Sequence, residues 1–157
     1  MPVTLQFVQG THVFDKAIQA YSHGWATHVD AAMPDGRLLG SQSHDIGGIP
    51  AGVQVRPPGY EQFARVLRIT LPATPRQEAD FWTFLTAQLG KPYDHDAIVG
   101  MAFGRDWHAA GSWFCSELQG AALEGCVVFP FPIAVAASCL TPPDLLLACS
   151  VIARITP

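Results

Sequence analysis

The spacing of hydrophobic residues along the chain predicts a series of short strands. Apolar runs, and apolar residues that alternate with polar ones, are typical of strands buried on one or both faces. The turn signal Pro34-Asp35-Gly36 joins two of these strands as a hairpin. The predicted strands cover residues 3–8, 26–33, 37–42, 53–55, 65–71 and, at the end of the chain, 151–156.

A second pattern, with apolar residues three or four positions apart, predicts helices. The best-marked helix has Thr74 as its cap, Pro75 in its first position, Gln77 completing a T-x-x-Q capping box, and Gly90 as its stop. The other predicted helical segments cover residues 14–21, 96–103, 114–123 and 141–148. Residues 43–58 read as a Gly- and Pro-rich connection, and residues 127–138 as an apolar segment punctuated by proline.

These elements, in a chain of 157 residues, indicate a single α+β domain covering residues 1–157. Hydrophobic residues make up 49% of the chain and charged residues 14%, below the usual ~25%. So lightly charged a surface suggests a protein partner or a larger assembly. Nine Lys and Arg against 13 Asp and Glu give a net charge of −4, so nucleic acid is not an expected partner.

The first residues, the longest apolar stretch and the cysteines indicate the cellular compartment that we expect for this protein. The first residues lack the basic start and long apolar run of a signal peptide, which predicts cytoplasmic synthesis. The longest apolar stretch, residues 126–140, is too short to span a bilayer, so no transmembrane segment is expected. The four cysteines are expected to be reduced rather than paired, and they are Cys115, Cys126, Cys139 and Cys149.

Cys115 is the candidate nucleophile, because the pattern places it in the first turn of the helix at 114–123. The helix dipole there favours the reactive thiolate form. The backbone N–H groups of a first turn lack intrahelical acceptors, so they also provide half of an oxyanion hole. The other three cysteines lack such a position and read as structural, as a cysteine at an arbitrary position usually is.

A thiolate nucleophile needs a base, and His28 is the best placed of six histidines. It lies at the start of a convincing strand, whereas His12, His44 and His95 lie in apparent turns. A strand-edge histidine with a satisfied backbone hydrogen bond is the alternative. The chain has no C-x-x-C, no H-E-x-x-H and no nucleotide-binding glycine motif, so neither a metal nor a cofactor is expected.

Five segments of the chain, in this order, resemble the circularly permuted NlpC-like papain-fold superfamily, in its YiiX-type branch. They are Thr27-His28-Val29, Asp35-Gly36 between two strands, Gly90-Lys91-Pro92-Tyr93-Asp94, Phe114-Cys115-Ser116-Glu117-Leu118, and the TPxDL element at residues 141–145. The resemblance covers most of the chain. It implies a papain-like antiparallel sheet packed against a helix that carries the nucleophilic cysteine. The permuted group has its histidine before its cysteine and includes the lecithin retinol acyltransferase relatives.

The resemblance also implies roles for single residues. Cys115 corresponds to the nucleophile, His28 to its general base, and Tyr93 to a tyrosine that lines the site and helps to hold the oxyanion. Such families carry a polar third residue roughly 12 positions after the histidine, but Gly40 stands there. We favour Gln42 as the residue that orients the His28 ring, with Ser41, Asp30, a backbone carbonyl or water as alternatives.

By this resemblance the expected function is that of a cysteine hydrolase, a peptidase or amidase acting on cell-wall-type peptides. Without a signal peptide it would reach the wall as part of a phage tail or secretion device, and would then be virion-associated. The alternatives are a lipid-type acyltransferase or thioesterase, and a non-catalytic papain-fold module. The fold and nucleophile do not by themselves fix the substrate.

Overall fold

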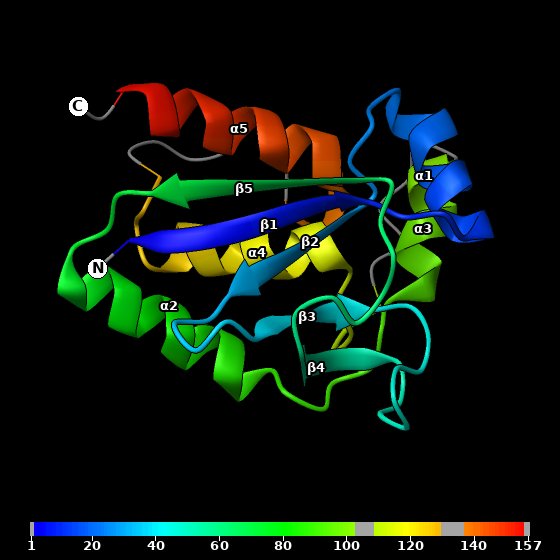
Figure 1. Cartoon of the computed structure of the whole chain (residues 1–157), viewed down its shortest axis with the longest axis horizontal. Helices are drawn as coiled ribbons and strands as arrows, with labels where there is room; N and C mark the ends of the chain where they lie inside the picture. The colour runs from blue at the N-terminus through cyan, green and yellow to red at the C-terminus, as the bar shows by residue number, and fades with distance from the viewer. Residues whose placement is uncertain (1, 103–108, 130–136, 156–157) are drawn as a thin grey trace.

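The computed structural model describes residues 2–102, 109–129 and 137–155. Five antiparallel strands form one sheet in the order β4-β3-β2-β1-β5, with β2 in the middle (Figure 1). All five strands predicted before residue 72 are confirmed, with ends within two residues of those expected. They are β1 (Val3–Gln9), β2 (His28–Ala32), β3 (Leu38–Gln42), β4 (Gly52–Arg56) and β5 (Arg65–Leu71).

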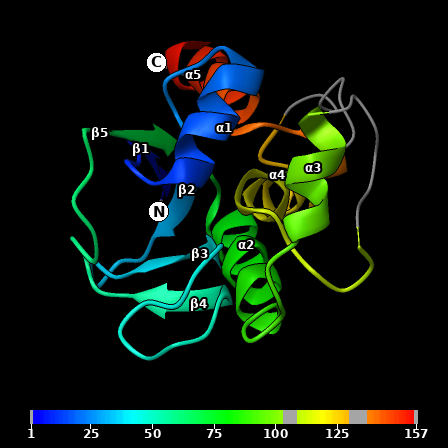
Figure 2. The same ribbon diagram turned by 90° about the vertical axis from the view of Figure 1, so that its right-hand side faces the viewer.

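The helices of the described residues lie mainly to one side of this sheet. Figure 2 shows the strands on one side and α2, α3 and α4 on the other. Among these, α4 packs directly on β2 and β3, while α5 contacts β5 at the sheet edge. The bounds are α1 (Val13–Ser22), α2 (Pro75–Ala87), α3 (His95–Ala102), α4 (Cys115–Gly125), the 3₁₀ turn η1 (Ala137–Cys139) and α5 (Pro142–Ile155). The α+β class is therefore confirmed.

The predicted capping box begins α2. Thr74 Oγ1 accepts a hydrogen bond from the Gln77 backbone N–H at 3.3 Å, and Gln77 Oε1 accepts one from the Thr74 N–H at 2.9 Å. Two backbone donors that a free helix end would leave unpaired are thus satisfied. The helix buries Phe81 and Leu85 and ends at Ala87, shortly before Gly90 with its φ of 81°.

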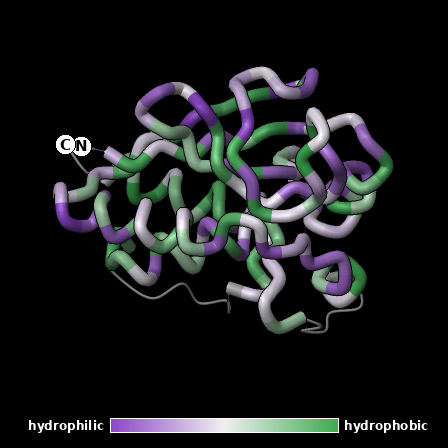
Figure 3. The backbone as a smooth tube through the Cα atoms, turned by 90° about the horizontal axis from the view of Figure 1, so that it is seen from below, coloured by the Kyte–Doolittle hydropathy of each residue, from purple (hydrophilic) through white to green (hydrophobic). Residues whose placement is uncertain are grey.

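The main core lies between the sheet and α4. Alternation along the strands directs Leu5, Val29 and Leu39 to this side, where they are fully buried with Leu118 and Ala122 of α4. Hydrophobic and hydrophilic stretches interchange along most of the traced chain (Figure 3). Within the described residues, no helix has both the length and the apolar character needed to cross a membrane.

The predicted strand at residues 151–156 is wrong. Residues up to Ile155 continue the helix that begins at Pro142, and that helix is longer than the one predicted to end at Ala148. Leu145, Cys149 and Ile152 are buried at helical spacing. Their burial on one face outweighs the strand preference of the β-branched residues near the end of the chain.

Three predictions reach residues whose structure is not described. The last residue of the helical turn expected at 96–103 is one, and the observed α3 covers His95–Ala102. Most of the apolar segment at 127–138 is another, because residues 130–136 lie outside the described ranges. Thr156, the end of the predicted final strand, is the third.

Candidate active site

Cys115 is the first residue of α4, as the sequence predicts, and only 1% of its surface is exposed. Phe114 is the residue before the helix, and its backbone N–H donates to Glu117 Oε2 at 3.1 Å. This contact closes the helix start in the way a capping box does. The first-turn amides, that of Cys115 included, have no carbonyl acceptor within the helix.

Two side-chain hydrogen bonds fix the start of α4 against the sheet. Ser41 Oγ donates to the Trp113 carbonyl at 2.6 Å, and Gln119 Nε2 donates to the Leu39 carbonyl at 3.0 Å. Both link the α4 region to β3. Ser41 therefore points toward the cysteine-bearing segment, on the opposite side of β3 from Gly40 and Gln42. Its hydrogen bond fixes the backbone two residues before Cys115 rather than the His28 ring.

His28 opens β2 and is largely buried, at 7% exposed. Thr27 anchors it, because the Thr27 N–H donates to the Val8 carbonyl and Thr27 Oγ1 accepts from the Gly10 N–H, both at 2.9 Å. The His28 ring interacts with two groups. Nε2 lies 2.9 Å from Asp30 Oδ1. Cys115 is close enough to the ring that its charge, after that of Asp30, raises the pKa of His28.

Asp30 is completely buried and has two further partners from the β4 end of the sheet. The Tyr60 hydroxyl donates to Oδ2 at 3.0 Å, and Arg56 Nη2 donates to Oδ1. The Arg56 guanidinium is itself buried and lies over the Tyr60 ring, 4.6 Å from its centroid. A buried carboxylate is stable only when it is paired and hydrogen-bonded, and these partners supply both requirements.

The charges of this cluster move three pKa values. Burial alone would lower the pKa of His28, but the nearby charges of Asp30 and Cys115 and their hydrogen bonds raise it to about 10. Burial would raise the pKa of Asp30, but Arg56 and then His28 lower it to about 2. Burial, followed by the Asp30 charge, raises the pKa of Tyr60. At neutral pH the cluster therefore holds a carboxylate, an imidazolium and a protonated phenol.

Gly40, where the resemblance leads one to expect a third polar residue, faces the Asp30 carboxylate. A Cβ built on Gly40 would lie 2.1 Å from Asp30 Oδ1 and 3.2 Å from Arg56 Nη2. The backbone register explains this approach, because Ala31 pairs with Leu39 and so brings Asp30 opposite Gly40. The missing side chain at position 40 thus leaves room for a carboxylate that comes from β2.

Gln42 shares the face of β3 that carries Gly40, and it lines a pocket together with His28. Its Oε1 accepts from the Ser43 N–H at 3.2 Å. Among the hydrogen bonds of the described residues, His28 Nε2 contacts Asp30 Oδ1 at 2.9 Å and, more weakly, Arg56 Nη2 at 3.5 Å. The sequence favours Gln42 as the orienting residue and leaves Asp30 as an alternative; in the structure the contact with the ring is made by Asp30.

Tyr93 lies next to the cysteine because its segment pairs with the residues just before α4. The Trp113 N–H donates to the Pro92 carbonyl at 3.0 Å, and the Asp94 N–H donates to the Trp113 carbonyl at 3.2 Å. The Tyr93 ring packs on Phe114, with the centroids 5.9 Å apart. Burial, and then the charge of Cys115, raise the pKa of Tyr93, so its hydroxyl stays protonated at neutral pH.

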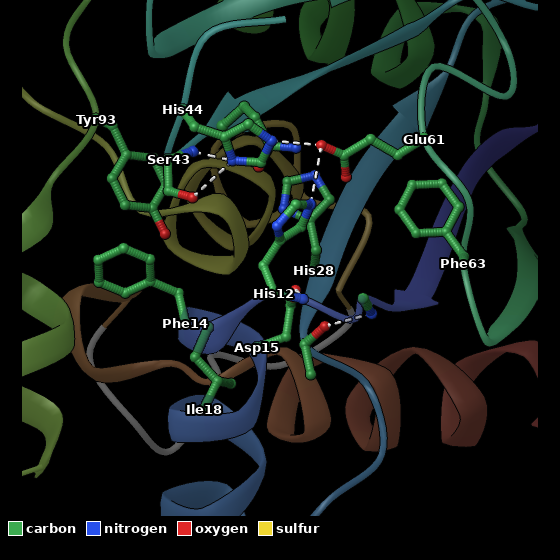
Figure 4. A pocket seen from close by; sticks show the side chains of 13 residues that line it. His12, Phe14, Asp15, Ile18, His28, Ser43, His44, Glu61, Phe63 and Tyr93 are labelled. Atoms are coloured by element: carbon green, nitrogen blue, oxygen red, sulfur yellow. Dashed lines mark hydrogen bonds and ion pairs between the residues drawn. The ribbon is translucent and has the colours of Figure 1, made fainter.

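The pocket in front of His28 is lined by segments that lie far apart in the sequence. They include the residues before α1, the start of β2, the end of β3, the β4–β5 connection and Tyr93. Figure 4 shows His28, Tyr93, His12, His44 and Glu61 around it. A substrate in this pocket would therefore meet the histidine that contacts Cys115.

Arg56 and Tyr60 are the residues of this cluster that the sequence analysis missed. Arg56 ends β4, yet it is among the largest fully buried side chains of the described residues. An arginine at the end of an apolar strand usually lies in solvent, so position alone gave no signal. The four cysteines are free thiols. No protein-family model matches this chain, and no curated protein matches it significantly.

Proposed function

We propose that this protein is a cysteine hydrolase in which Cys115 is the nucleophile, His28 the general base and Asp30 the residue that orients His28. The observation that carries the proposal is that the His28 ring interacts with two groups: Nε2 lies 2.9 Å from Asp30 Oδ1, and Cys115 is close enough that its charge raises the pKa of the ring. A nucleophile, a base within reach and a third group that fixes the base form the arrangement that activates a thiol.

The reaction follows from these positions. The Cys115 thiolate attacks a substrate carbonyl carbon, and the carbonyl electron pair moves onto its oxygen. The Cys115 backbone N–H and the Tyr93 hydroxyl stabilise that oxyanion. When the carbonyl re-forms, the bond to the leaving group breaks, and the His28 imidazolium gives its proton to that group. His28 then takes a proton from water, the hydroxide attacks the thioester, and acid and thiolate are released.

The substrate class we propose is a peptide or amide, and cell-wall-type peptides are the candidates that the papain-like resemblance suggests. The same nucleophile also serves a thioesterase or acyltransferase, in which the leaving group or acceptor differs. Membership of the permuted NlpC-like superfamily and assembly into a tail or secretion device belong to the same proposal. What supports it is the pairing of a helix-start cysteine with a strand-start histidine.

Alkylation of the four cysteines tests the nucleophile. Three of them are similarly buried, at 1% for Cys115, 5% for Cys126 and 0% for Cys149, so differences in their rates report chemistry rather than access. Burial raises the pKa of Cys149 to about 12 and also raises that of Cys126. Iodoacetamide at pH 6.5, with peptide mapping over time, should label Cys115 first, and the half-buried Cys139 controls for access.

Acylation separates the candidate reactions. The protein is incubated with a peptide amide and, separately, with an activated acyl thioester, and intact mass spectrometry detects acyl-Cys115. We expect acylation by the amide, with Cys115→Ala as the blank. Acylation by the thioester alone would favour the thioesterase alternative. Slow alkylation of Cys115 together with no acylation by either compound would contradict catalysis and favour a non-catalytic module.

A further inference from the structure

A second cluster of chemically active side chains lies at the rim of the His28 pocket. His12 precedes α1, His44 follows β3, and Glu61 lies in the β4–β5 connection. Their ligand atoms all lie within 4.8 Å of one another. All three line the same pocket as His28, and Figure 4 shows both imidazoles directed at the Glu61 carboxylate. The proposed reaction uses none of them.

The two imidazoles share one carboxylate oxygen. His44 Nε2 contacts Glu61 Oε1, and His12 Nε2 lies 3.7 Å from the same oxygen. The rings of His12 and His44 have centroids 4.9 Å apart and are tilted by 52°. Two Nε2 atoms and a carboxylate oxygen, from three separate segments, therefore lie within 4.8 Å of one another.

This donor set suits a zinc ion. Zinc takes imidazole nitrogen and carboxylate oxygen at about 2.0–2.2 Å, which puts tetrahedral ligand atoms about 3.4 Å apart. The His12–Glu61 pair, at 3.7 Å, needs to close by only about 0.3 Å, while the short His44–Glu61 contact must lengthen to admit the ion. Because the ligand atoms all lie within 4.8 Å of one another, no pair needs to close by more than about 1.4 Å. His12 and His44 can make that movement, since 58% and 38% of their side-chain surfaces are exposed. Glu61, with 17% of its side-chain surface exposed, has less freedom to move.

A contact behind the cluster orients one of the imidazoles. His44 Nδ1 lies 3.3 Å from Ser43 Oγ, so Nδ1 has a partner while Nε2 faces the Glu61 carboxylate. Without a metal Nε2 donates its proton to that carboxylate, and a bound metal ion would take the place of the proton. Fixing one ring nitrogen in this way orients an imidazole ligand. On the other side, the backbone N–H of His12 donates to Asp15 Oδ2 at 2.8 Å, which holds the segment carrying that ligand.

We propose that His12, His44 and Glu61 form a binding site for a divalent transition-metal ion of the zinc class, with an open fourth position. The open position faces the pocket and takes water or a carboxylate oxygen of a bound molecule. Three ligands leave such a position free in tetrahedral zinc sites. Sequence motifs predict no metal because the three residues come from separate segments that only the fold brings together.

Metal binding is best measured in the Cys115→Ala variant. That change removes a thiol that would itself bind metal beside His28, and it makes the result independent of the proposed catalysis. Isothermal titration with Zn²⁺ should show one equivalent bound. Titration with Co²⁺ should give d–d absorption bands of a four- or five-coordinate site, without the thiolate-to-cobalt charge-transfer band that cysteine ligands would add.

Matched variants in the same background identify the ligands. His44→Asn and Glu61→Gln should each weaken Zn²⁺ binding by at least about tenfold, because the loss of a direct ligand exceeds the 10–100-fold effect of an outer contact. His23→Asn is the control, since His23 is exposed, lies outside the cluster and has a left-handed backbone that asparagine accepts.

The result is decisive in either direction. Stoichiometric binding that both ligand variants weaken, and that the His23 variant leaves unchanged, supports the site. No saturable binding of either ion, a thiolate charge-transfer band, or equal binding by all variants overturns it. Circular dichroism and urea unfolding without metal establish that each variant is folded, and His12→Asn provides a third ligand variant should one of the others fail to fold.

Discussion

The Asp30 carboxylate fills the space that any side chain at Gly40 would occupy, since a Cβ there would lie 2.1 Å from Asp30 Oδ1. The two residues face each other across β2 and β3. A polar residue at position 40 would reach His28 from the neighbouring strand, whereas Asp30 reaches it from two positions along the same strand. The absence of a side chain at Gly40 therefore makes room for the Asp30 carboxylate that contacts His28.

Gly40→Ala should disrupt this arrangement. The added methyl group must displace a buried carboxylate that is held by His28, Arg56 and Tyr60, which costs about 1–3 kcal/mol of stability. The rate of Cys115 alkylation at pH 6.5 should fall as Asp30 shifts away from the ring. Gly125→Ala is the matched control, because a Cβ there has no neighbour within 4 Å. Equal effects of the two substitutions would contradict the prediction.

Asp30→Asn should slow both alkylation and acylation of Cys115. Loss of the negative charge removes the group that orients His28 and raises the pKa of its ring, so His28 activates the Cys115 thiol less well. General-base function is worth about 10²–10⁴-fold, and we expect a loss in that range. Gln42→Ala is compared in the same assays. A larger loss from Gln42→Ala than from Asp30→Asn would return the orienting role to Gln42.

Arg56→Met should destabilise the fold strongly. The substitution keeps an apolar stem but removes the guanidinium partner of the buried Asp30 carboxylate, and breaking a buried ion pair in this way typically costs about 3–5 kcal/mol. Arg76→Met provides the contrast, because Arg76 forms an exposed pair with Asp80 at 3.7 Å. Exposed pairs are worth about 0–1 kcal/mol. Urea unfolding of both variants measures the difference in the free energy of unfolding. Similar losses of stability would show that the buried Arg56–Asp30 pair contributes no more than an exposed pair.

The free energy of unfolding should decline at both ends of the pH range. The pKa of His28 is raised from 6.5 to about 10, so its contribution is complete below 6.5 and is lost as pH rises toward 10. The pKa of Asp30 is lowered from 3.8 to about 2, so its contribution is complete above 3.8 and is lost as pH falls toward 2.

Urea unfolding across this pH range checks the prediction against His28→Gln. The variant cannot gain the imidazolium charge, so its stability should decline less between pH 6.5 and 10 than that of the unchanged protein. Cys115→Ala should retain part of the alkaline decline, because Asp30 still favours the charged ring. An unchanged alkaline profile in His28→Gln would assign the decline to other groups.

The local elements of this protein follow from its sequence because their causes are local. The Thr74–Gln77 capping box and the turn at Asp35-Gly36 act within a few residues, and the alternating strands require only a period of two. The first-turn position of Cys115 is of the same kind. The final helix was misjudged because its end is set by burial against the rest of the fold, which short-range preferences do not report.

The candidate site depends on pairings that only the tertiary structure decides. The sequence provided Cys115 and His28 as candidates, but the partner of the ring depends on strand register, which brings Gly40 against Asp30 and lets Arg56 reach it from β4. The rim cluster of His12, His44 and Glu61 joins three separate connections. Contacts between distant segments depend on how the whole chain packs, and a buried charge is stable only where that packing supplies its partners.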